Sequence, residues 1–356
     1  RVLRGGRLEG NAPVSKRVEK TLESMLGARF VLLMTSCTHA LESAVRVLEL
    51  EPGDEVILPS FSFPSAANAV LLAGMKPVFA EVRPDTLNLD PDDLERRITG
   101  RARAVIPVHY AGVSCDMGRI MEIAKRRGLQ VIEDAAQCIG AYYGQNALGT
   151  IGDIGAISFH ATKNVVAGEG GAFITNDEEL FRKADIFREK GTNRSRFLAG
   201  EIDKYSWVSP GSSFVLSDIL SALLEVQLGK LNDLTGQRER VDRIYRQGLR
   251  DLESDGLLRM GAIPDYCRPN CHIFFIQVDP ARRDSVLRSL KEAGIQATTH
   301  FYPLHLSEMG QRLGWREGDF PVTETAFRSL IRVPIYPGLS DTEALRVVET
   351  LQRILR

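Results

Sequence analysis

One lysine stands where a charged side chain is unusual. Two apolar runs, at residues 154–159 and 172–175, have the pattern of short buried strands, and the loop between them contains Lys163 and the glycine-rich stretch 168–171. Core strands on both sides would partly desolvate the amine, lower its pKa and make it a nucleophile towards a carbonyl carbon. An ordinary lysine on a surface hairpin is the alternative that this stretch leaves open. The glycines do not match the dinucleotide fingerprint G-x-G-x-x-G, and no helix signal follows them.

The elements that must position this lysine alternate between strands and helices. Apolar runs predict seven strands, at residues 29–34, 55–59, 77–81, 104–108, 130–134, 154–159 and 172–175. Helical patterns lie between several of them, at residues 39–50, 64–74 and 117–127. Such alternation indicates a largely parallel sheet that is covered on both faces. In sheets of this kind, ligands bind beyond the carboxyl ends of the strands.

A second, smaller unit is expected after the sheet. The helical pattern at residues 214–234 predicts a bridge between a large domain, residues 1–234, and a small C-terminal α/β domain, residues 235–356. We predict that the small domain has strands at 272–278 and 296–299 and helices at 284–293 and 341–355. The connecting region 189–213 is long, polar and rich in basic and aromatic residues, and long structured loops are often functional.

Bulk composition excludes several classes of function. The chain has 356 residues, 44% of them hydrophobic, and a net charge of −1, so we expect a large core and no nucleic-acid partner. We expect no membrane association, since no apolar run reaches membrane-spanning length, and the first ten residues lack the apolar core of a signal peptide. Five scattered cysteines fit a reduced, cytoplasmic protein. Cys267, Cys271 and His272 have no second ligand pair at zinc spacing, so we expect buried thiols and no metal.

Three polar features would converge at the strand ends. The stretch Ser36-Cys37-Thr38 joins a strand to a helix, where free N–H groups and the helix dipole can bind a phosphate, although Ser36 could simply cap the helix. Asp134 ends a buried strand and needs a partner, either a cationic ring nitrogen or the backbone that follows it. Lys163 supplies an amine, with Ser158 five residues before it. Phosphate, pyridinium nitrogen and aldehyde are the three groups by which pyridoxal 5′-phosphate is held.

Five segments in this order resemble one known family over nearly the whole chain, the DegT/DnrJ/StrS sugar-nucleotide aminotransferases. They are TSCTHAL (35–41), EVILPSFSFPSAANAV (55–70), VIEDAAQCIGAYY (131–143), GDIGAISFHATKNVVAGEGG (152–171) and HFYPLH (300–305). The resemblance implies the type I fold of pyridoxal-phosphate-dependent aminotransferases, which has a mostly parallel seven-stranded sheet and a smaller C-terminal α/β domain. It also implies pyridoxal 5′-phosphate as the cofactor.

The resemblance assigns cofactor contacts to particular residues of this sequence. Lys163 would form the Schiff base with the cofactor and be the catalytic residue. The other contacts would be Asp134 to the pyridinium nitrogen, Gln137 to the phenolic oxygen, Phe63 over the ring, and Ser158, Cys37 and Thr38 to the phosphate. One segment departs from the family pattern G-x-N-x-R-M, because residues 211–216 read GSSFVL. Ser213 replaces the asparagine that reaches the partner subunit's cofactor, and its hydroxyl could still donate a hydrogen bond.

The resemblance further implies a homodimer with shared active sites, in which the loop 189–213 crosses to the partner. Lys190 and Arg194 of that loop would then meet the substrate diphosphate, although a solvated charged loop is the alternative. His160, Tyr302 and His305 would contact the substrate. A packed, hydrogen-bonded His160 and ordinary loop positions for the other two remain open.

The implied reaction is amino transfer from L-glutamate to C4 of a TDP-4-keto-6-deoxy-hexose. The segments FHATKN (159–164), REKGTNRSRFLAGEIDKYSWV (188–208) and GSSFVLSD (211–218) are similar to those of the 4-aminotransferases in this family. The first alternative is a C3 aminotransferase acting on a 3-keto sugar, and the second is a non-catalytic homologue that binds the cofactor and regulates. A sugar dehydratase is disfavoured because those relatives carry histidine where this chain has Lys163, and a nicotinamide dehydrogenase because its fingerprint is absent.

Overall fold

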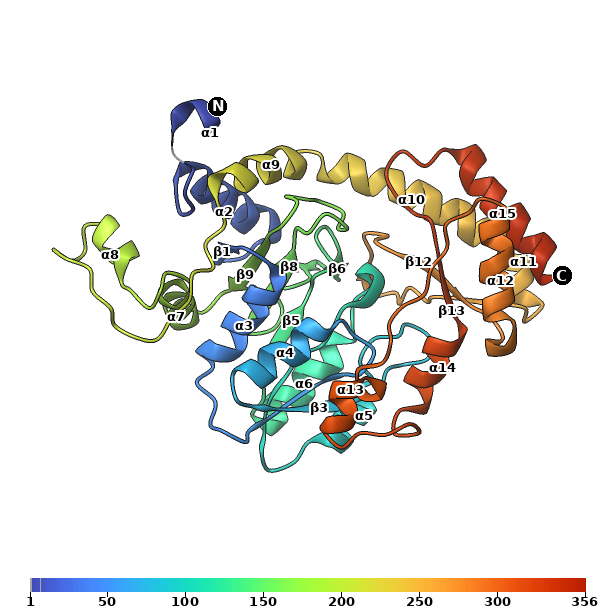
Figure 1. Cartoon of the computed structure of the whole chain (residues 1–356), viewed down its shortest axis with the longest axis horizontal. Coiled ribbons are helices and arrows are strands. Elements are labelled where there is room, and N and C mark those ends of the chain that lie inside the picture. The colour runs from blue at the N-terminus through green and yellow to red at the C-terminus, as the bar shows by residue number, and fades with distance from the viewer. Residues whose placement is uncertain (1, 7) are drawn as a thin grey trace.

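A seven-stranded sheet forms the centre of the first part of the chain (Figure 1). The computed structural model describes residues 2–6 and 8–356. The strands are β1 (Phe30–Met34), β2 (Glu55–Pro59), β3 (Lys76–Ala80), β4 (Ala102–Val105), β5 (Gln130–Asp134), β8 (Ile154–Ser158) and β9 (Gly171–Thr175). Their order is β1-β9-β8-β5-β4-β2-β3, and β9 runs antiparallel to both of its neighbours while the other pairs are parallel. The prediction of a mostly parallel seven-stranded sheet is confirmed.

Helices cover both faces of this sheet, because successive side chains of each strand point to opposite sides. In β1, Leu32 joins the core under one set of helices, whereas Val31 and Leu33 join the core on the other face. The first set is α3 (Cys37–Val47), α4 (Pro64–Leu72) and α7 (Glu178–Arg188). The opposite face carries α2 (Pro13–Leu26), α5 (Pro91–Arg97), α6 (Met117–Arg127) and α9 (Asp218–Leu228). Strand lengths of four or five residues match fully buried parallel strands.

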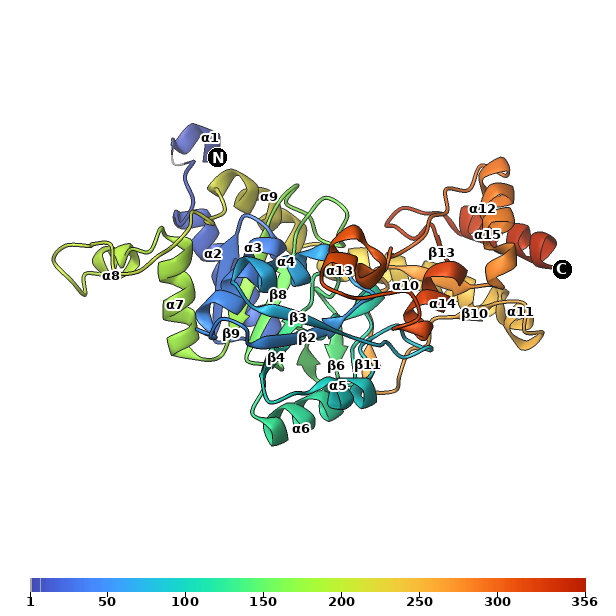
Figure 2. The same cartoon turned by 60° about the horizontal axis from the view of Figure 1, so that its bottom comes forward.

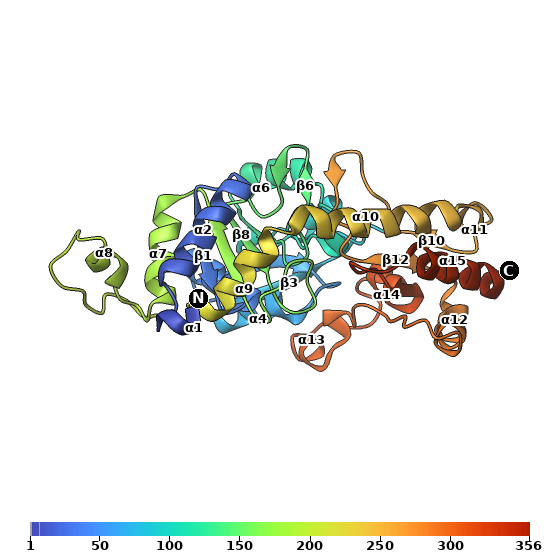
Figure 3. The same ribbon diagram turned by 90° about the horizontal axis from the view of Figure 1, so that it is seen from above.

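The second part of the chain has a small antiparallel sheet with its own core. Its strands follow the order β10 (Arg259–Met260), β12 (Phe274–Gln277) and β13 (Leu330–Val333). The helices that pack around it are α10 (Leu231–Gly248), α11 (Arg250–Ser254), α12 (Pro280–Glu292), α14 (Pro321–Ser329) and α15 (Asp341–Leu355). Seen from above, α9 and α10 run along the molecule from the large sheet to α15 (Figure 3). The predicted domain boundary at residue 234 falls inside α10, so this helix belongs to the connection as well as to the second part, and the division remains a prediction.

Two sequence-based predictions need correction in this region. The single helix expected at 214–234 is two helices, because α9 ends at Leu228 and α10 begins at Leu231. The strand expected at 296–299 makes only one bridge, between Thr298 and Arg332. The strands that pair with β12 are β10 and β13, neither of which the sequence analysis predicted. Burial alternates along 295–298 as in a strand, but an apolar alternation does not specify a pairing partner.

Shorter elements complete the described chain. They are α1 (Val2–Gly5), β6 (Tyr142–Tyr143), β7 (Asn146–Ala147), α8 (Arg194–Leu198), β11 (Cys267–Arg268), α13 (Glu308–Arg312) and the 3₁₀ turns Tyr110–Gly112 and Leu304–Leu306. Strand β11 pairs with β6, so a segment from the second half of the chain extends a small sheet of the first half. Within residues 2–6 and 8–356, none of the helices has the length and apolarity needed to span a bilayer.

Glu81 ties the two parts together at the end of β3. Its buried carboxylate accepts hydrogen bonds from Val322 N at 2.9 Å and from both the backbone N and the hydroxyl of Thr323, at 2.9 and 2.6 Å. These donors belong to the first turn of α14, so a side chain of the large sheet caps a helix of the second part. In Figure 2, α14 and α13 lie beside the β3 end of the sheet.

Removing this cap should destabilise the protein. Glu81→Ala leaves several buried donors without an acceptor, and we expect a loss of about 3 kcal/mol in the free energy of unfolding. Urea denaturation followed by circular dichroism measures the change. Glu179→Ala is the control, because Glu179 is exposed and makes an ion pair only with Lys183. Equal midpoints for the two variants would contradict the capping role.

Candidate active site

A cavity of about 430 Å³ opens beyond the carboxyl ends of the central strands. Residues just after β1, β2 and β4 and the last residues of β5 and β8 line it, together with residues of the second part of the chain. The lining residues used below are Ser36, Cys37, Thr38, Phe63, Ser65, His109, Asp134, Ala136, Gln137, Ser158, His160, Lys163, Glu169, His272, His300, Phe301 and Arg332. Ligand binding at this edge is what the parallel topology predicts.

The loop between β8 and β9 presents Lys163 to the cavity. Backbone hydrogen bonds close the loop at its base, from Phe159 N to Gly170 O and from Ala161 N to Gly168 O, both at 2.9 Å. Burial lowers the pKa of the Lys163 amine, and the carboxylate of Asp134 opposes that shift only in part. The amine therefore has more neutral, nucleophilic character than an exposed lysine.

Asp134 lies at the end of β5 with its carboxylate in the same cavity. Burial raises its pKa, while the Ala136 N–H, which donates to Oδ1 at 3.1 Å, and the charge of Lys163 oppose the rise. The backbone bond that the sequence analysis considered as an alternative is thus present. This bond engages only Oδ1 of Asp134. A cation in the cavity would pair with Oδ2 and offset the free-energy cost of burying the carboxylate.

The N-terminus of α3 forms another wall. Ser36 caps this helix by accepting a hydrogen bond from His39 N at 3.0 Å, and the first-turn N–H groups of Cys37 and Thr38 belong to residues that line the cavity. Gly171 of β9 packs against this turn so closely that a Cβ there would lie 2.3 Å from Cys37 N. Only glycine at that position leaves room for the turn, which the helix dipole makes suitable for an anion.

Gln137 and Phe63 complete the predicted cofactor contacts in this chain. The Ala111 N–H donates to Gln137 Oε1 at 2.7 Å, which leaves the amide N–H₂ of Gln137 available to an acceptor in the cavity. Phe63, directly before α4, is 61% exposed, and its ring centroid is 6.5 Å from that of Phe301. Ser158 accepts a hydrogen bond from His160 N at 3.3 Å.

His160 also lines the cavity, at its exposed side. Its Nδ1 is 2.9 Å from the Thr162 hydroxyl, and its Nε2 is 3.6 Å from Glu169 Oε1. Both interpretations of His160 thus have support, since the ring is hydrogen-bonded and at the same time accessible to a ligand.

Four predicted substrate residues and Ser213 lie outside this cavity. Lys190 and Arg194 are on the surface, with their charged groups 3.7 and 3.9 Å from Glu189 Oε2. Ser213 is exposed beside Glu189, to which it is joined by a backbone bridge. Tyr302 is largely exposed and donates to Leu306 O at 3.3 Å.

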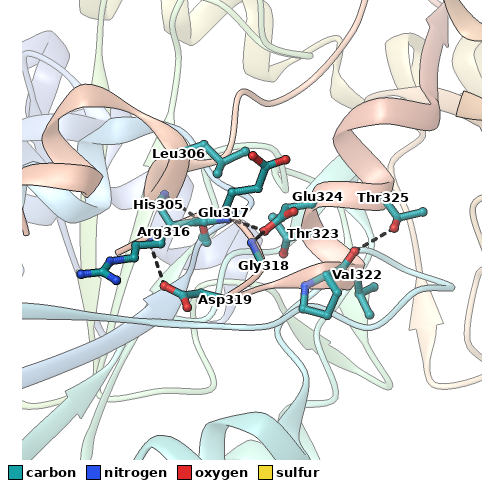
Figure 4. Close-up of polar contacts among 12 residues, drawn as sticks. His305, Leu306, Arg316, Glu317, Gly318, Asp319, Val322, Thr323, Glu324 and Thr325 are labelled. Carbon is teal, nitrogen blue, oxygen red and sulfur yellow. Dashed lines mark hydrogen bonds and ion pairs between the residues drawn. The ribbon is translucent and has the colours of Figure 1, made fainter. Parts of the chain in front are cut away.

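His305 is fully buried, and both ring nitrogens are engaged. Nδ1 is 2.6 Å from the Ser60 hydroxyl, and Nε2 is 3.1 Å from Glu324 Oε1 (Figure 4). The carboxylate of Glu324 also accepts from Gly318 N at 2.6 Å. In this chain the side chain of His305 therefore holds the segment 304–324 against the end of β2, and it does not reach the cavity.

Several cavity residues were missed by the sequence analysis. His272 had been considered only as a metal ligand, and its Nδ1 is 2.8 Å from Oδ1 of Asn164, the residue after Lys163. Asn164 Nδ2 donates to Asn270 O at 3.0 Å, so the segment 270–272 is fastened to the Lys163 loop. Burial lowers the pKa of His272 well below its usual range.

Arg332, His300 and Phe301 are three further cavity residues that had no predicted role. Arg332 had one sequence signal, because it is a lone charged residue in the apolar stretch LIRVPI at residues 330–335. His300 and Phe301 belong to the segment HFYPLH, in which only the later residues had been selected.

Comparisons with known proteins agree with this geometry. The profile described as the DegT/DnrJ/EryC1/StrS aminotransferase family matches residues 1–352. The chain belongs to this family. It is 35% identical over 353 residues to the spore coat polysaccharide biosynthesis protein SpsC of Bacillus subtilis (strain 168), which covers 97% of this chain and 90% of that protein.

Solved structures of aminotransferases have the same fold. DesV of S. venezuelae superposes with a TM-score of 0.92 at 32% identity, covering 100% of this chain and 92% of that one. The PLP form of the putative sugar aminotransferase Spr1654 from Streptococcus pneumoniae has a TM-score of 0.91 at 26% identity, with coverages of 99% and 94%. This member of the DegT/DnrJ/EryC1/StrS family is therefore a pyridoxal-phosphate-dependent sugar aminotransferase with the aminotransferase fold.

The residues of the cavity fit the cofactor of the family. An amine of lowered pKa, a buried carboxylate and a helix N-terminus lie around one space of about 430 Å³. These are the groups required by an aldehyde, a pyridinium nitrogen and a phosphate.

The electrostatics of the site predict how Lys163 titrates in the cofactor-free protein. Competitive acetylation at a series of pH values, read by peptide mass spectrometry, should give Lys163 a midpoint below the ordinary lysine value of 10.5, because burial disfavours the ammonium form. Asp134→Asn should lower the midpoint further, since the Asp134 carboxylate raises the pKa of Lys163.

The exposed Lys20 serves as the internal reference in the same digest. A Lys163 midpoint at or above that of Lys20 would show that burial does not control this amine. A midpoint that rises in Asp134→Asn would contradict the effect of the Asp134 carboxylate.

Proposed function

We propose that the protein transfers the amino group of L-glutamate to C4 of a TDP-4-keto-6-deoxy-hexose and gives a TDP-4-amino-4,6-dideoxy-hexose. The observation that carries the proposal is the cavity in which Lys163, Asp134 and the start of α3 lie around one space. The C4 assignment and the nucleotide rest on the similarity of residues 159–164, 188–208 and 211–218 to the 4-aminotransferases of the family. The exposed ring of Phe63 and the half-buried ring of Phe301 at the cavity give an apolar wall against which a 6-deoxy sugar can pack.

Lys163 is the proposed catalytic residue. Pyridoxal phosphate, when bound, supplies the aldehyde that accepts the amino group and the ring that withdraws electrons from the reacting carbon. The Lys163 amine would take the proton from the α-carbon of the amino donor. Its lowered pKa suits a base that must be neutral when it takes this proton. The same side chain returns the proton in the second half of the cycle, when the keto sugar receives the amine.

Asp134 and its neighbours would hold the ring in position. The Asp134 carboxylate keeps a proton on the ring nitrogen, and this pairing removes the cost of a buried, uncompensated charge on either group. The free amide N–H₂ of Gln137 donates to the phenolic oxygen, and Phe63 stacks on the ring. The hydroxyl of Ser158 and the N–H groups of Cys37 and Thr38 bind the phosphate.

A homodimer with shared sites is part of the proposal. The arm, residues 189–213 with helix α8, projects from the body of the molecule (Figure 1). It carries exposed apolar side chains, among which Trp207 is 76% exposed. Such a surface favours burial against another copy of the chain. There, Lys190 and Arg194 would meet the substrate diphosphate, and Ser213 would reach the cofactor phosphate of the partner subunit.

A cytoplasmic location completes the proposal, because the described chain has five buried, free cysteines. Tyr302 remains a proposed substrate contact, since its exposed ring follows the cavity residue Phe301. For His305 we propose a positioning role through Ser60, three residues before Phe63.

The substrate assignment is tested by giving the loaded enzyme the 4-keto and the 3-keto TDP-6-deoxy-hexose separately, each with L-glutamate. We expect turnover with the 4-keto compound and at least about tenfold less with the 3-keto compound, because the bound diphosphate orients one ring carbon towards the amine. Product structures are read by NMR. Turnover confined to the 3-keto sugar would replace the C4 assignment with C3, and absence of any cofactor-dependent transamination would favour a regulatory homologue.

The shared site is tested by complementation. Lys163→Ala and Arg194→Ala should each be inactive alone, whereas a mixed dimer should regain one of its two sites, with Lys163 from one subunit and Arg194 from the other. Coexpression with two different tags isolates the mixed dimer. Arg196→Ala is the control in the same arm, because Arg196 is exposed and paired with Glu201 at 3.0 Å. Mixed dimers that stay inactive would contradict the crossing of the arm.

A further inference from the structure

Arg332 is a cation on the cavity wall that has no anionic partner among the described residues. It lies in β13, opposite Phe275 of β12, and its side chain lines the cavity together with Lys163. Its Nε is buried and has no hydrogen-bond partner in the described chain. Its Nη1 contacts His300 Nε2, and burial lowers the pKa of the guanidinium. A buried charge that lacks a counter-ion is costly, so this arrangement is expected where a ligand supplies the anion.

His300 cannot supply that anion. Arg332 can only donate, so His300 Nε2 accepts, and the proton of the neutral ring lies on Nδ1, 3.3 Å from the Tyr110 hydroxyl. Burial and the charge of Arg332 lower the pKa of His300 to about 3. The neutral His300 ring thus orients the guanidinium and leaves its charge uncompensated.

The other charged groups at the cavity do not neutralise Arg332 either. Lys163 carries the same sign as Arg332, and each lowers the pKa of His300. The acids that line the cavity are Asp134, at the end of β5, and Glu169, which faces His160. On the wall that Arg332 forms with the neutral rings of His300 and His272, the charge is therefore positive.

We propose that Arg332 binds the α-carboxylate of the amino donor. This assignment rests on the proposed function and adds the residue that selects the donor. A guanidinium matches a carboxylate with two parallel hydrogen bonds, and the unpaired Nε together with one Nη would provide them. The α-carboxylate is one bond from the carbon whose proton Lys163 must take, so it must lie within the same cavity as Lys163. The diphosphate of a sugar that is aminated at C4 is attached across the ring at C1, and it extends away from this position.

The experiment separates the two halves of the reaction. In a single turnover with L-glutamate, followed by the absorbance of the cofactor, Arg332→Gln should raise the half-saturating glutamate concentration about 10- to 100-fold, because a charge-assisted pair is lost. The half-saturating glutamate concentration of Arg332→Lys should lie between those of the wild type and Arg332→Gln. Lysine keeps the positive charge but cannot form the two parallel hydrogen bonds of a guanidinium. In the return half-reaction, the pyridoxamine-phosphate form reacts with the keto-sugar nucleotide. There the half-saturating concentration of the nucleotide should change less than about threefold.

Two isomeric donors identify which carboxylate is bound. L-2-aminobutanoate keeps the α-carboxylate of glutamate and lacks the distal one, whereas 4-aminobutanoate lacks the α-carboxylate. Each is measured as a competitor of L-glutamate, which does not require that it react. Arg332→Gln should weaken the binding of L-2-aminobutanoate about 10- to 100-fold and leave the binding of 4-aminobutanoate nearly unchanged. A variant that weakens only 4-aminobutanoate would assign Arg332 to the distal carboxylate and overturn the proposal.

Controls distinguish this result from a general defect. Arg259→Gln changes another arginine of the same small sheet, one that bonds Gln277 and does not line the cavity, and it should match wild type throughout. Calorimetric titration of the pyridoxamine-phosphate form with glutarate measures dicarboxylate binding without chemistry, and Arg332→Gln should weaken it about tenfold or more.

Two further outcomes would overturn the inference, and a third would overturn only the proposed function. If Arg332→Gln raises the half-saturating concentration of the keto-sugar nucleotide and leaves glutamate unaffected, the anion is a substrate phosphate. If neither changes, Arg332 serves packing alone. A wild-type enzyme that binds glutarate in an Arg332-dependent way and yet does not transaminate glutamate would contradict the proposed function and leave the carboxylate site intact.

Discussion

The burial of a lysine amine at the carboxyl end of a parallel sheet is the constraint on which the rest of the structure depends. Lys163 can be held there because the antiparallel strand β9 turns the chain back into the sheet, so that a loop between two core strands opens into the cavity. Burial lowers the pKa of this amine, and the carboxylate of Asp134 limits the shift. Lys163 and Asp134 therefore determine together how nucleophilic the amine is and how costly its burial is.

This balance requires contributions from segments that are far apart in the chain. The Lys163 loop is fastened to residue 270 through Asn164, and His272 is oriented by the same amide. Glu81 caps α14, and Ser60 engages His305, so the segment 305–323 is hydrogen-bonded to residues that directly follow β3 and β2. These bonds hold His272, His300, Phe301 and Arg332 at the wall of the cavity.

The cavity wall carries buried charges of both signs. Asp134 lies at the strand end, where a ring cation would pair with it, and Arg332 lies on the small sheet, where an anion would pair with it. Each group is costly to bury alone, and each becomes favourable when a ligand of the opposite charge enters. The same logic explains why His300 and His272 are held neutral beside Lys163 and Arg332.

Local pattern was enough to predict most of the large sheet. The strands expected at 55–59 and 130–134 and the helix at 117–127 have the predicted bounds, because continuous burial and amphipathic spacing are properties of short stretches. The residue types Lys163, Asp134 and Ser158 could be selected for the same reason, since each ends or follows an apolar strand. The ordered segments of the family resemblance then predicted the fold and the cofactor, which the comparisons confirm.

Tertiary structure alone decided which distant residues meet. It brought Arg332 and His300 to a lysine more than a hundred residues earlier, placed the ring of His305 in a buried contact with Ser60, and paired β12 with β13. A strand pattern states which face is apolar and does not state which strand lies beside it. An arginine in an apolar stretch does not reveal its ligand until the cavity that surrounds it is known. The sequence determined the chemistry of the individual groups, and long-range packing determined which of those groups share one site.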